Sequence, residues 1–164
     1  MERIPLDSGG QAVPPGLSLR THFVNTPVVS CYDAAAQKGI DLRCELKTLI
    51  LDTTVGVVAV HVPGDRTASL RLVKRALNCA EACLSSRATL SALGLAPGTV
   101  SALLPPVWAM KHLVCESVFD QDVISTNNGT LTGYFLFSPD VLRSAQQLSI
   151  GHYSLPSHSA SRRS

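Results

Sequence analysis

The chain lacks several features that would place it in a particular class of protein. No run of about twenty apolar residues occurs among its 164 residues, so the sequence predicts no membrane span. Its N-terminus has no charged-then-apolar secretion pattern, which predicts a cytoplasmic protein. Charged residues make up only 16% and the net charge is +2, too little for the whole surface to attract nucleic acid. Any contact with RNA must therefore come from a local cationic patch.

The cysteines form neither a disulfide framework nor a recognisable zinc site. Their number is odd, five, and they are scattered over segments that read as helix or strand, which suits buried reduced thiols. Cys79 and Cys83 are close enough to share a metal, but a closed zinc site needs a second pair of ligands. No other Cys or His pair lies at matching spacing, so we expect no metal.

Composition and patterning divide the chain into three parts. Residues 1–21 carry glycine and proline pairs without a sustained period, and predict an irregular lead. Residues 151–164 are rich in serine and predict a flexible tail. Between them, residues 22–150 alternate helical and strand patterns without a repeat, and 45% of the chain is hydrophobic. This predicts a single α+β (mixed α/β) domain with its own core.

Two helices are marked by caps and spacing. Thr26 and Pro27 predict the start of a helix that runs to Lys38 and stops at Gly39. Residues 67–77 have helical spacing with one apolar face. The other face is cationic and is a candidate for binding tRNA phosphates, the alternative being a solvated surface. Its residues are Arg71, Lys74 and Arg75.

A hairpin and a final helix are expected near the C-terminus. Residues 122–126 and 130–137 flank Asn127-Asn128-Gly129, and Asn-Gly between two apolar runs is a strong hairpin signal. Ser138 and Pro139 then predict the first turn of a helix that continues through Gln147.

One lysine interrupts a run that otherwise reads as a buried strand. Lys47 lies within residues 45–51, and a second β-rich run, residues 55–62, follows and ends at Pro63-Gly64-Asp65. Burying an unpartnered ammonium is costly, so such a lysine is paired, reaches an edge, or stays at the lip of a pocket. We expect the pocket lip, with a solvated strand edge as the alternative.

Five stretches occur in a familiar order. They are Thr26-Pro27 through Gly39-Ile40, Lys47-Thr48-Leu49, Val62-Pro63-Gly64-Asp65, the loop Gly94–Ser101, and the hairpin that runs into Ser138–Leu142. Over residues 24–147 the chain thereby resembles the YbaK/prolyl-tRNA synthetase-associated domain family, which hydrolyses wrongly charged aminoacyl-tRNAs. The resemblance implies a mixed, mostly antiparallel curved sheet with packed helices.

The resemblance also implies a function. It implies a hydrolase that removes a small amino acid from mischarged tRNA in trans, in tRNA-Pro-type editing. Partners would be the acceptor end of aminoacyl-tRNA and an aminoacyl-tRNA synthetase, without a cofactor. In the family a vicinal ribose hydroxyl assists the attack of water, which fits the lack of a serine or cysteine triad in this sequence.

Residue roles follow from the same resemblance. The family's strand lysine, which contacts the terminal nucleotide, corresponds to Lys47, and its glycine-loop amides near the scissile carbonyl correspond to Gly98. A lysine is a mobile cationic donor, and a glycine lets N–H groups approach a carbonyl closely. The neighbouring positions implied to bind substrate are Thr48, Thr99, Val100, Ser101, Asn128 and Gly129.

The loop departs from the family pattern and keeps other functions open. Ala102 follows Ser101 where relatives commonly have proline, which favours a catalytically silent module that binds tRNA or a synthetase. Hydrolysis of another small ester or amide on the same fold is a third hypothesis. His61 and His112 are expected at strand ends or on the surface, and Trp108 as a core or lid anchor or a stacking surface for a base.

Overall fold

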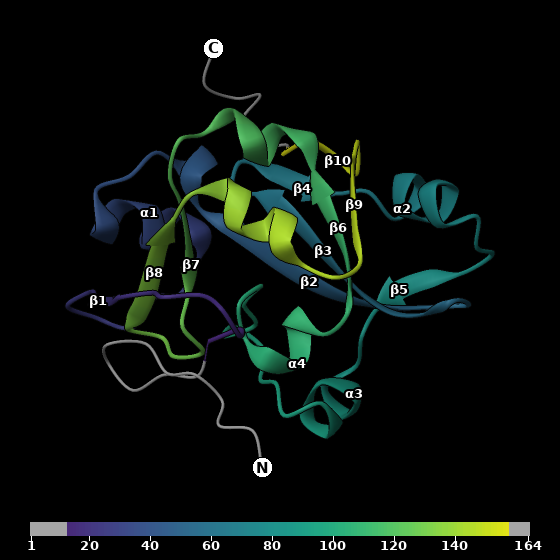
Figure 1. Cartoon of the computed structure of the whole chain (residues 1–164), viewed down its shortest axis with the longest axis horizontal. Coiled ribbons are helices and arrows are strands. Elements are labelled where there is room, and N and C mark those ends of the chain that lie inside the picture. Colours follow the sequence, from purple (N-terminus) through teal and green to yellow (C-terminus); the bar gives the residue numbers. More distant parts are fainter. Residues whose placement is uncertain (1–12, 158–164) are drawn as a thin grey trace.

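A five-stranded mixed sheet forms the centre of the molecule, and a three-stranded sheet and short helices surround it (Figure 1). The structure, a computed structural model, describes residues 13–157. The central sheet has the order β5-β2-β3-β6-β9. Its strands are β2 (Leu46–Thr53), β3 (Gly56–Pro63), β5 (Ala82–Leu84), β6 (Lys111–Cys115) and β9 (Leu148–Gly151).

The remaining strands form two smaller sheets. The order β1-β8-β7 joins β1 (Thr21–Phe23), β8 (Gly133–Phe137) and β7 (Ile124–Asn127), all antiparallel. A two-stranded sheet joins β4 (Arg66–Ala68) and β10 (Ser154–Pro156). The helices are α1 (Cys31–Lys38), α2 (Leu70–Leu77), α3 (Arg87–Ala92) and α4 (Pro105–Trp108), with 3-10 turns η1 (Leu42–Cys44), η2 (Glu116–Asp120) and η3 (Pro139–Ser144).

Strand pairing confirms the expected fold class. β2 is antiparallel to β3 and β5, whereas β3, β6 and β9 run parallel to one another. β3 lies between β2 and β6 and is buried over most of its length, from Val58 to Pro63. A strand covered on both faces reads as a continuous apolar run, which is the pattern of Val57–Val60 in the sequence.

Two apolar clusters pack on the central sheet. Val60, Val62 and Leu113 belong to the larger cluster, which also holds Val73 of α2. Ile50 and Ala59 belong to the smaller one, with Leu95 and Val107. Full burial of each such valine or leucine contributes about 1.5–3 kcal/mol, so these contacts are the main source of stability.

The first helix is shorter than the sequence predicts. α1 begins at Cys31 and not at Pro27, because Ser30 and not Thr26 is the N-cap: Asp33 N–H donates to Ser30 Oγ at 3.1 Å. Asp33 returns a bond from its carboxylate, which accepts the N–H of Val29 at 3.0 Å. The predicted end is confirmed, since Gly39 adopts a left-handed conformation with φ 67°.

The second helix and the tail differ from prediction for a shared reason. Thr67 and Ala68 pair with Leu155 and Ser154 in the β4–β10 sheet, so α2 starts at Leu70 after its N-cap Ser69. The expected flexible tail therefore contains a strand between residues 154 and 156. Strands pair through backbone hydrogen bonds and need no apolar run, so the serine-rich composition gave no indication of this strand. Residues 158–164 of the tail lie outside the described part.

The irregular lead also contributes to the core, because Val13 is fully buried in the larger cluster. Residues 1–12 lie outside the described part. No helix within residues 13–157 is long and apolar enough to span a membrane.

The C-terminal hairpin is confirmed, but its connection is longer than an Asn-Gly turn. Ile124 pairs with Phe137 and Asn127 with Tyr134, which leaves residues 128–132 as the connection. The final helix is a 3-10 segment that ends at Ser144, capped as expected by Ser138, which accepts Asp140 N–H at 3.3 Å. Residues 145–147, the rest of that predicted helix, form a bend that leads into β9, which pairs with β6.

Candidate functional site

A pocket of about 500 Å³ lies beside the first half of β2. β5 pairs only with Leu51–Thr53, and residues 46–50 of β2 line the pocket together with α1, β8, α3 and the loop before α4. Four residues singled out from the sequence line it: Lys47, Thr48, Gly98 and Val100. The topology therefore brings together parts of the chain that lie far apart in the sequence.

Lys47 is partly buried and has one hydrogen-bond partner among the described residues. Its Nζ donates to the carbonyl oxygen of Arg66 at 2.7 Å. Arg66 is itself held by β10, because it pairs with Pro156 and its guanidinium donates to the Oγ and the carbonyl of Ser154, at 2.7 and 3.1 Å. Within residues 13–157 no carboxylate forms an ion pair with Lys47. Its positive charge is thus uncompensated beside the pocket.

The glycine loop lies opposite β2 and offers backbone donors. Gly98 has φ 87°, which favours glycine, and nothing lies within 4 Å of the position a Cβ would take. Among the described residues, no backbone acceptor is bonded to the N–H of Gly98 or of Val100. Thr99 does not line the pocket; its N–H and Oγ1 both donate to Ala96 O at 3.2 Å and close the turn.

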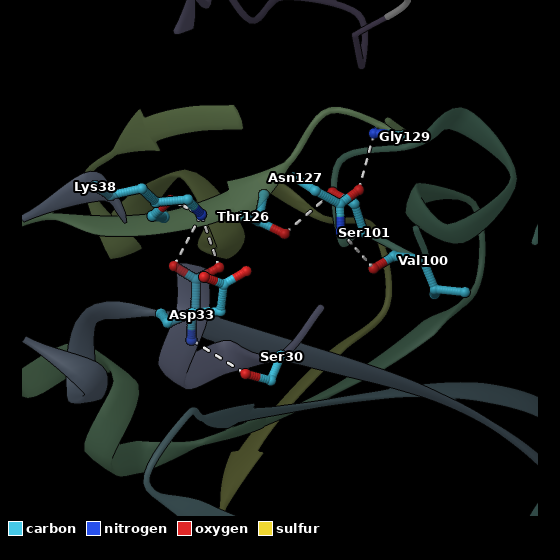
Figure 2. A network of polar contacts seen from close by, with 10 residues as sticks. Ser30, Asp33, Lys38, Val100, Ser101, Thr126, Asn127 and Gly129 are labelled. Atoms are coloured by element: carbon cyan, nitrogen blue, oxygen red, sulfur yellow. Dashed lines mark hydrogen bonds and ion pairs between the residues drawn. The ribbon is translucent and has the colours of Figure 1, made fainter. Parts of the chain in front are cut away.

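Asn127 connects this loop to the β7–β8 hairpin (Figure 2). Its Nδ2 donates to Val100 O at 3.1 Å, and its Oδ1 accepts the N–H of Gly129 at 2.8 Å. Asn127 lines the pocket, as does Thr130, whereas Asn128 and Gly129 do not. The Asn-Gly signal thus identified the right turn but not the residue that reaches the pocket.

Ser101 and Asn128 make contacts inside the protein. Ser101 is fully buried, and its Oγ accepts the hydroxyl of Thr126 at 3.2 Å (Figure 2). Asn128 is also buried, and its Oδ1 accepts the N–H and the Oγ1–H of Thr130 at 3.1 and 2.7 Å. Both side chains hold the loops that form the pocket wall.

A buried ion pair forms another part of the wall, and no pattern in the sequence predicts it. Lys38 Nζ donates to both carboxylate oxygens of Glu45, at 2.8 and 2.9 Å, and to Ser125 Oγ at 2.9 Å. The two charged side chains are only 3% and 7% exposed. Burial raises the pKa of Glu45, and the neighbouring Lys38 opposes this shift. Sequence reasoning assigns Lys38 only to the end of a helix, since its partners lie on other elements.

Cys31 places a thiol in the pocket at the start of α1. Burial raises the pKa of this thiol, although the charge of Lys47 acts in the opposite direction. A raised pKa keeps the thiol protonated at neutral pH, and the thiol is the less reactive form.

His61 and His112 are not at strand ends or on the surface, as expected, but are buried with 0% and 1% exposure. His61 Nδ1 lies 2.9 Å from Thr48 Oγ1, and His61 Nε2 lies 2.7 Å from His112 Nδ1. Burial lowers the pKa of both imidazoles, that of His61 well below its ordinary range. Trp108 packs against the larger core cluster with its ring edge-on to His112, as a core anchor does.

The cationic face of α2 is remote from the pocket. Arg71 and Arg75 are exposed and Lys74 is partly buried, but none lines the pocket. Figure 1 shows α2 at one end of the central sheet and α1 with β8 at the other. The arginine that does line the pocket is Arg87 of α3, which is exposed. Within the described residues no cluster of three or more His, Cys, Asp or Glu side chains could hold a metal.

Comparison with known proteins agrees with this architecture. The model of the aminoacyl-tRNA editing domain family matches residues 25–145. A solved structure of the hypothetical protein APE2540 has a TM-score of 0.74 at 25% identity, covering 85% of this chain and 93% of its own. A "putative trans-editing enzyme for prolyl tRNA synthetase" has a TM-score of 0.74 at 16% identity, covering 84% and 87%. No curated protein sequence matches significantly. Because the family match spans most of the chain and the fold agrees with it, the chain belongs to the aminoacyl-tRNA editing domain family.

Proposed function

We propose that this protein is an aminoacyl-tRNA deacylase that hydrolyses, in trans, the ester of tRNA mischarged with a small amino acid, in tRNA-Pro-type editing. The observation that carries the proposal is the pairing of an uncompensated ammonium, Lys47, with the unbonded N–H groups of Gly98 and Val100 around one pocket. Both kinds of group bind the acceptor end, and the developing oxyanion of an ester, well.

The hydroxyl and thiol groups of the pocket favour water as the nucleophile. Ser30 Oγ caps α1, and Ser85 Oγ donates to Asp52 at 2.9 Å. The Cys31 thiol is protonated because its pKa is raised by burial. Among the described residues neither Ser30 nor Cys31 is bonded to a basic side chain through its hydroxyl or thiol hydrogen, and Ser85 is bonded to a carboxylate and not to an imidazole, which supports direct hydrolysis of an ester that is already reactive. Lys47 and Gly98 are then the catalytic residues, and Thr48 and Val100 bind the substrate.

The size and lining of the pocket suit a small aminoacyl group. A volume of about 500 Å³ lies within the range of small-molecule sites. Ile50, Leu90 and Val100 contribute apolar lining, which accepts a short side chain. Asn127 and Thr130 replace Asn128 and Gly129 as the hairpin residues expected to contact substrate.

Contacts with tRNA divide into a near and a far part. Arg87 at the pocket is suited to the phosphates next to the terminal adenosine, while Arg71, Lys74 and Arg75 are suited to phosphates further along the acceptor stem. The proposal includes an aminoacyl-tRNA synthetase as a further partner and a cytoplasmic location, where tRNA is charged.

The catalytically silent module is the rival, because Ala102 replaces the family's proline. Contacts around Ala102 weaken the case that this substitution makes the loop too flexible for catalysis. Ala102 is fully buried in the larger core cluster, Ser101 is bonded to Thr126, and Val100 is bonded to Asn127. The loop is therefore held by packing and hydrogen bonds that can supply the rigidity of a proline.

Deacylation of a panel of tRNAs tests the proposal. tRNAs charged with alanine, cysteine, serine, threonine and proline would be incubated with wild type, Lys47→Ala and Lys111→Ala, the last being an exposed lysine outside this pocket. We expect hydrolysis of one or two mischarged species, lost in Lys47→Ala and kept in Lys111→Ala. No acceleration over buffer for any species, with tRNA binding retained, would establish the silent module instead.

A further inference from the structure

A continuous buried chain of hydrogen bonds leads from the pocket into the protein. Thr48 Oγ1 lies 2.9 Å from His61 Nδ1, His61 Nε2 lies 2.7 Å from His112 Nδ1, and His112 Nε2 lies 3.0 Å from the carbonyl oxygen of Trp108. The three side chains come from the adjacent strands β2, β3 and β6, and Thr48 is directly opposite His61 in the β2–β3 pairing. Only Thr48 lines the pocket.

The direction of every bond in this chain follows from its inner end. A carbonyl oxygen can only accept, so His112 Nε2 carries the hydrogen. His112 is neutral, because burial lowers its pKa, and its Nδ1 is therefore a bare acceptor. His61 Nε2 must then donate to it, which leaves His61 Nδ1 bare in turn, since the pKa of His61 is lowered further. The hydroxyl hydrogen of Thr48 must point to His61.

The outer end of the chain is consequently fixed as an acceptor. Thr48 has one hydroxyl hydrogen, which His61 holds, so that Oγ1 can offer only lone pairs to any other group. We propose that His61 and His112 are positioning residues that hold Thr48 Oγ1 as a hydrogen-bond acceptor at the pocket, and that it binds an N–H or O–H donor of the aminoacyl-adenosine end. The inference rests on the proposed function and deepens it.

The substrate contains two donors of this kind next to the ester. One is the α-ammonium group of the amino acid, and the other is the free vicinal hydroxyl of the terminal ribose. A ligand that lacks the donor leaves the lone pairs of Thr48 Oγ1 facing it without a hydrogen to accept, and covering such an acceptor without satisfying it is costly. A site that binds a substrate donor through a buried polar group discriminates strongly against ligands without that donor. Apolar walls such as Ile50 and Val100 discriminate only weakly between side chains of different size.

The Thr48–His61–His112 series of hydrogen bonds positions the Thr48 hydroxyl and does not carry protons. If Thr48 passed its hydrogen to His61 during attack by water, His61 would become an imidazolium ion with no carboxylate bonded to it among the described residues. Complete burial disfavours that ion, and its low pKa expresses the same fact. Burying two polar imidazoles has a desolvation cost, and the direction that they impose on the Thr48 hydroxyl is a role that an apolar pair could not fill.

Nuclear magnetic resonance tests the direction of the bonds without reference to activity. Long-range ¹H–¹⁵N correlation at neutral pH reports which imidazole nitrogen is protonated. We expect Nε2–H with bare Nδ1 for both His61 and His112, while exposed His152 serves as an internal reference. A protonated Nδ1 on His61 would overturn the inference, since Thr48 would then be free to donate to the pocket.

Binding of non-hydrolysable probes tests the other part of the inference, that Thr48 Oγ1 accepts a hydrogen bond from the substrate. An RNA minihelix ending in a 3′-aminoacylamino-3′-deoxyadenosine would be prepared in full form, with the α-amino group replaced by hydrogen, and lacking the 2′-hydroxyl, and Kd measured by calorimetry. We expect Thr48→Val to weaken binding of the full probe about tenfold, the scale of one hydrogen bond to a polar or charged partner, and Thr48→Ser to retain it. The loss disappears with whichever probe lacks the donor, which identifies the ammonium or the ribose hydroxyl.

A double variant tests the positioning role of the histidines. His112→Phe should weaken binding in the wild-type background and have no further effect in Thr48→Val, provided thermal unfolding shows both proteins folded. If His112→Phe does not fold, the Thr48→Val comparison alone decides. Equal affinity of Thr48→Val and wild type, or an equal loss with all three probes, overturns the inference. A wild type that binds no probe overturns the proposed function and the hydrogen bond from substrate to Thr48 together, while the tautomer measurement still decides the direction of the bonds.

Discussion

Lys38 and Lys47 line the same pocket, and their ammonium groups lie in different electrostatic environments. The side chain of Lys38 is 3% exposed, makes three hydrogen bonds and is neutralised by Glu45. Lys47 is partly buried and donates to one backbone carbonyl without a carboxylate partner among the described residues. Burial of a charge and its availability to a ligand are therefore separate properties of these two lysines. Lys38 holds the wall, whereas Lys47 contributes positive charge to the pocket.

The largest effect on stability is expected from breaking the Lys38 pair. Lys38→Met leaves the carboxylate of Glu45 buried without its cation, and loss of one partner of a buried pair costs about 3–5 kcal/mol of unfolding free energy. Urea unfolding measures this loss. Arg43→Met, which removes the exposed Arg43–Asp41 pair, is the control and should change stability little. A loss for Lys38→Met no greater than the control would show that the pair does not hold the wall.

A smaller effect is expected at Gly98, on the Lys47 side of the comparison. Gly98→Ala meets no neighbouring atom but forces an alanine into φ 87°, which costs about 1–2 kcal/mol of stability. Because the new methyl enters open space beside the pocket, deacylation should fall more than stability explains. Gly16→Ala, also at positive φ with open space around it but outside the pocket lining, is the matched control. Equal activity of the two variants would argue against a role for the Gly98 loop.

Acid should destabilise the protein through its uncharged buried groups. His61 and His112 have pKa values below the ordinary 6.5. Below pH 6.5 the unfolded chain therefore binds protons that the folded chain does not, and the free energy of unfolding decreases as the pH is lowered. Glu45 acts in the opposite direction, because its raised pKa makes the folded state the better proton acceptor above the ordinary value of 4.5. Melting temperatures from pH 7.5 to 5.5, roughly the range in which histidine titrates, should therefore decline. His112→Phe should flatten the decline and His152→Asn should not; an equally steep decline in His112→Phe would contradict the assignment.

The smallest effects are expected on the cationic face of α2, where each charge is exposed or partly buried. Replacing Arg71, Lys74 and Arg75 together by alanine should weaken binding of full-length tRNA. The slope of log Kd against log salt should fall by about one for each phosphate that the variant no longer neutralises. Hydrolysis of a short acceptor minihelix should be unchanged, because these residues do not line the pocket. An unchanged salt slope would mean that this face is simply solvated.

Features that depend on neighbouring residues were predictable from the sequence, and those that depend on distant pairing were not. The Gly39 stop, the Ser138 cap and the β7–β8 hairpin follow from local turn and cap chemistry, and the structure has all of them. The Lys38–Glu45 pair and the Thr48–His61–His112 chain join different elements. No periodicity within one element could have revealed either.

The hairpin shows the same limit at the scale of one residue. Asn128-Gly129 carries the turn signal, yet Asn127 lines the pocket and binds the Gly98 loop. The longer connection places the end of β7 at Asn127 and turns Asn128 inward, where it bonds Thr130. Sequence reasoning located the turn, but the strand register decided which side chain reached the site.

The most direct test compares Lys47→Met with Lys38→Met in one preparation, measuring both kcat/KM for deacylation and the free energy of unfolding. We expect Lys47→Met to lose about a hundredfold or more in kcat/KM, the scale of one lost transition-state donor, and to keep most of its stability. Lys38→Met should instead show the larger loss in the free energy of unfolding. Full activity in Lys47→Met, with wild-type hydrolysis measurable, would contradict the central claim that the uncompensated lysine acts on the substrate.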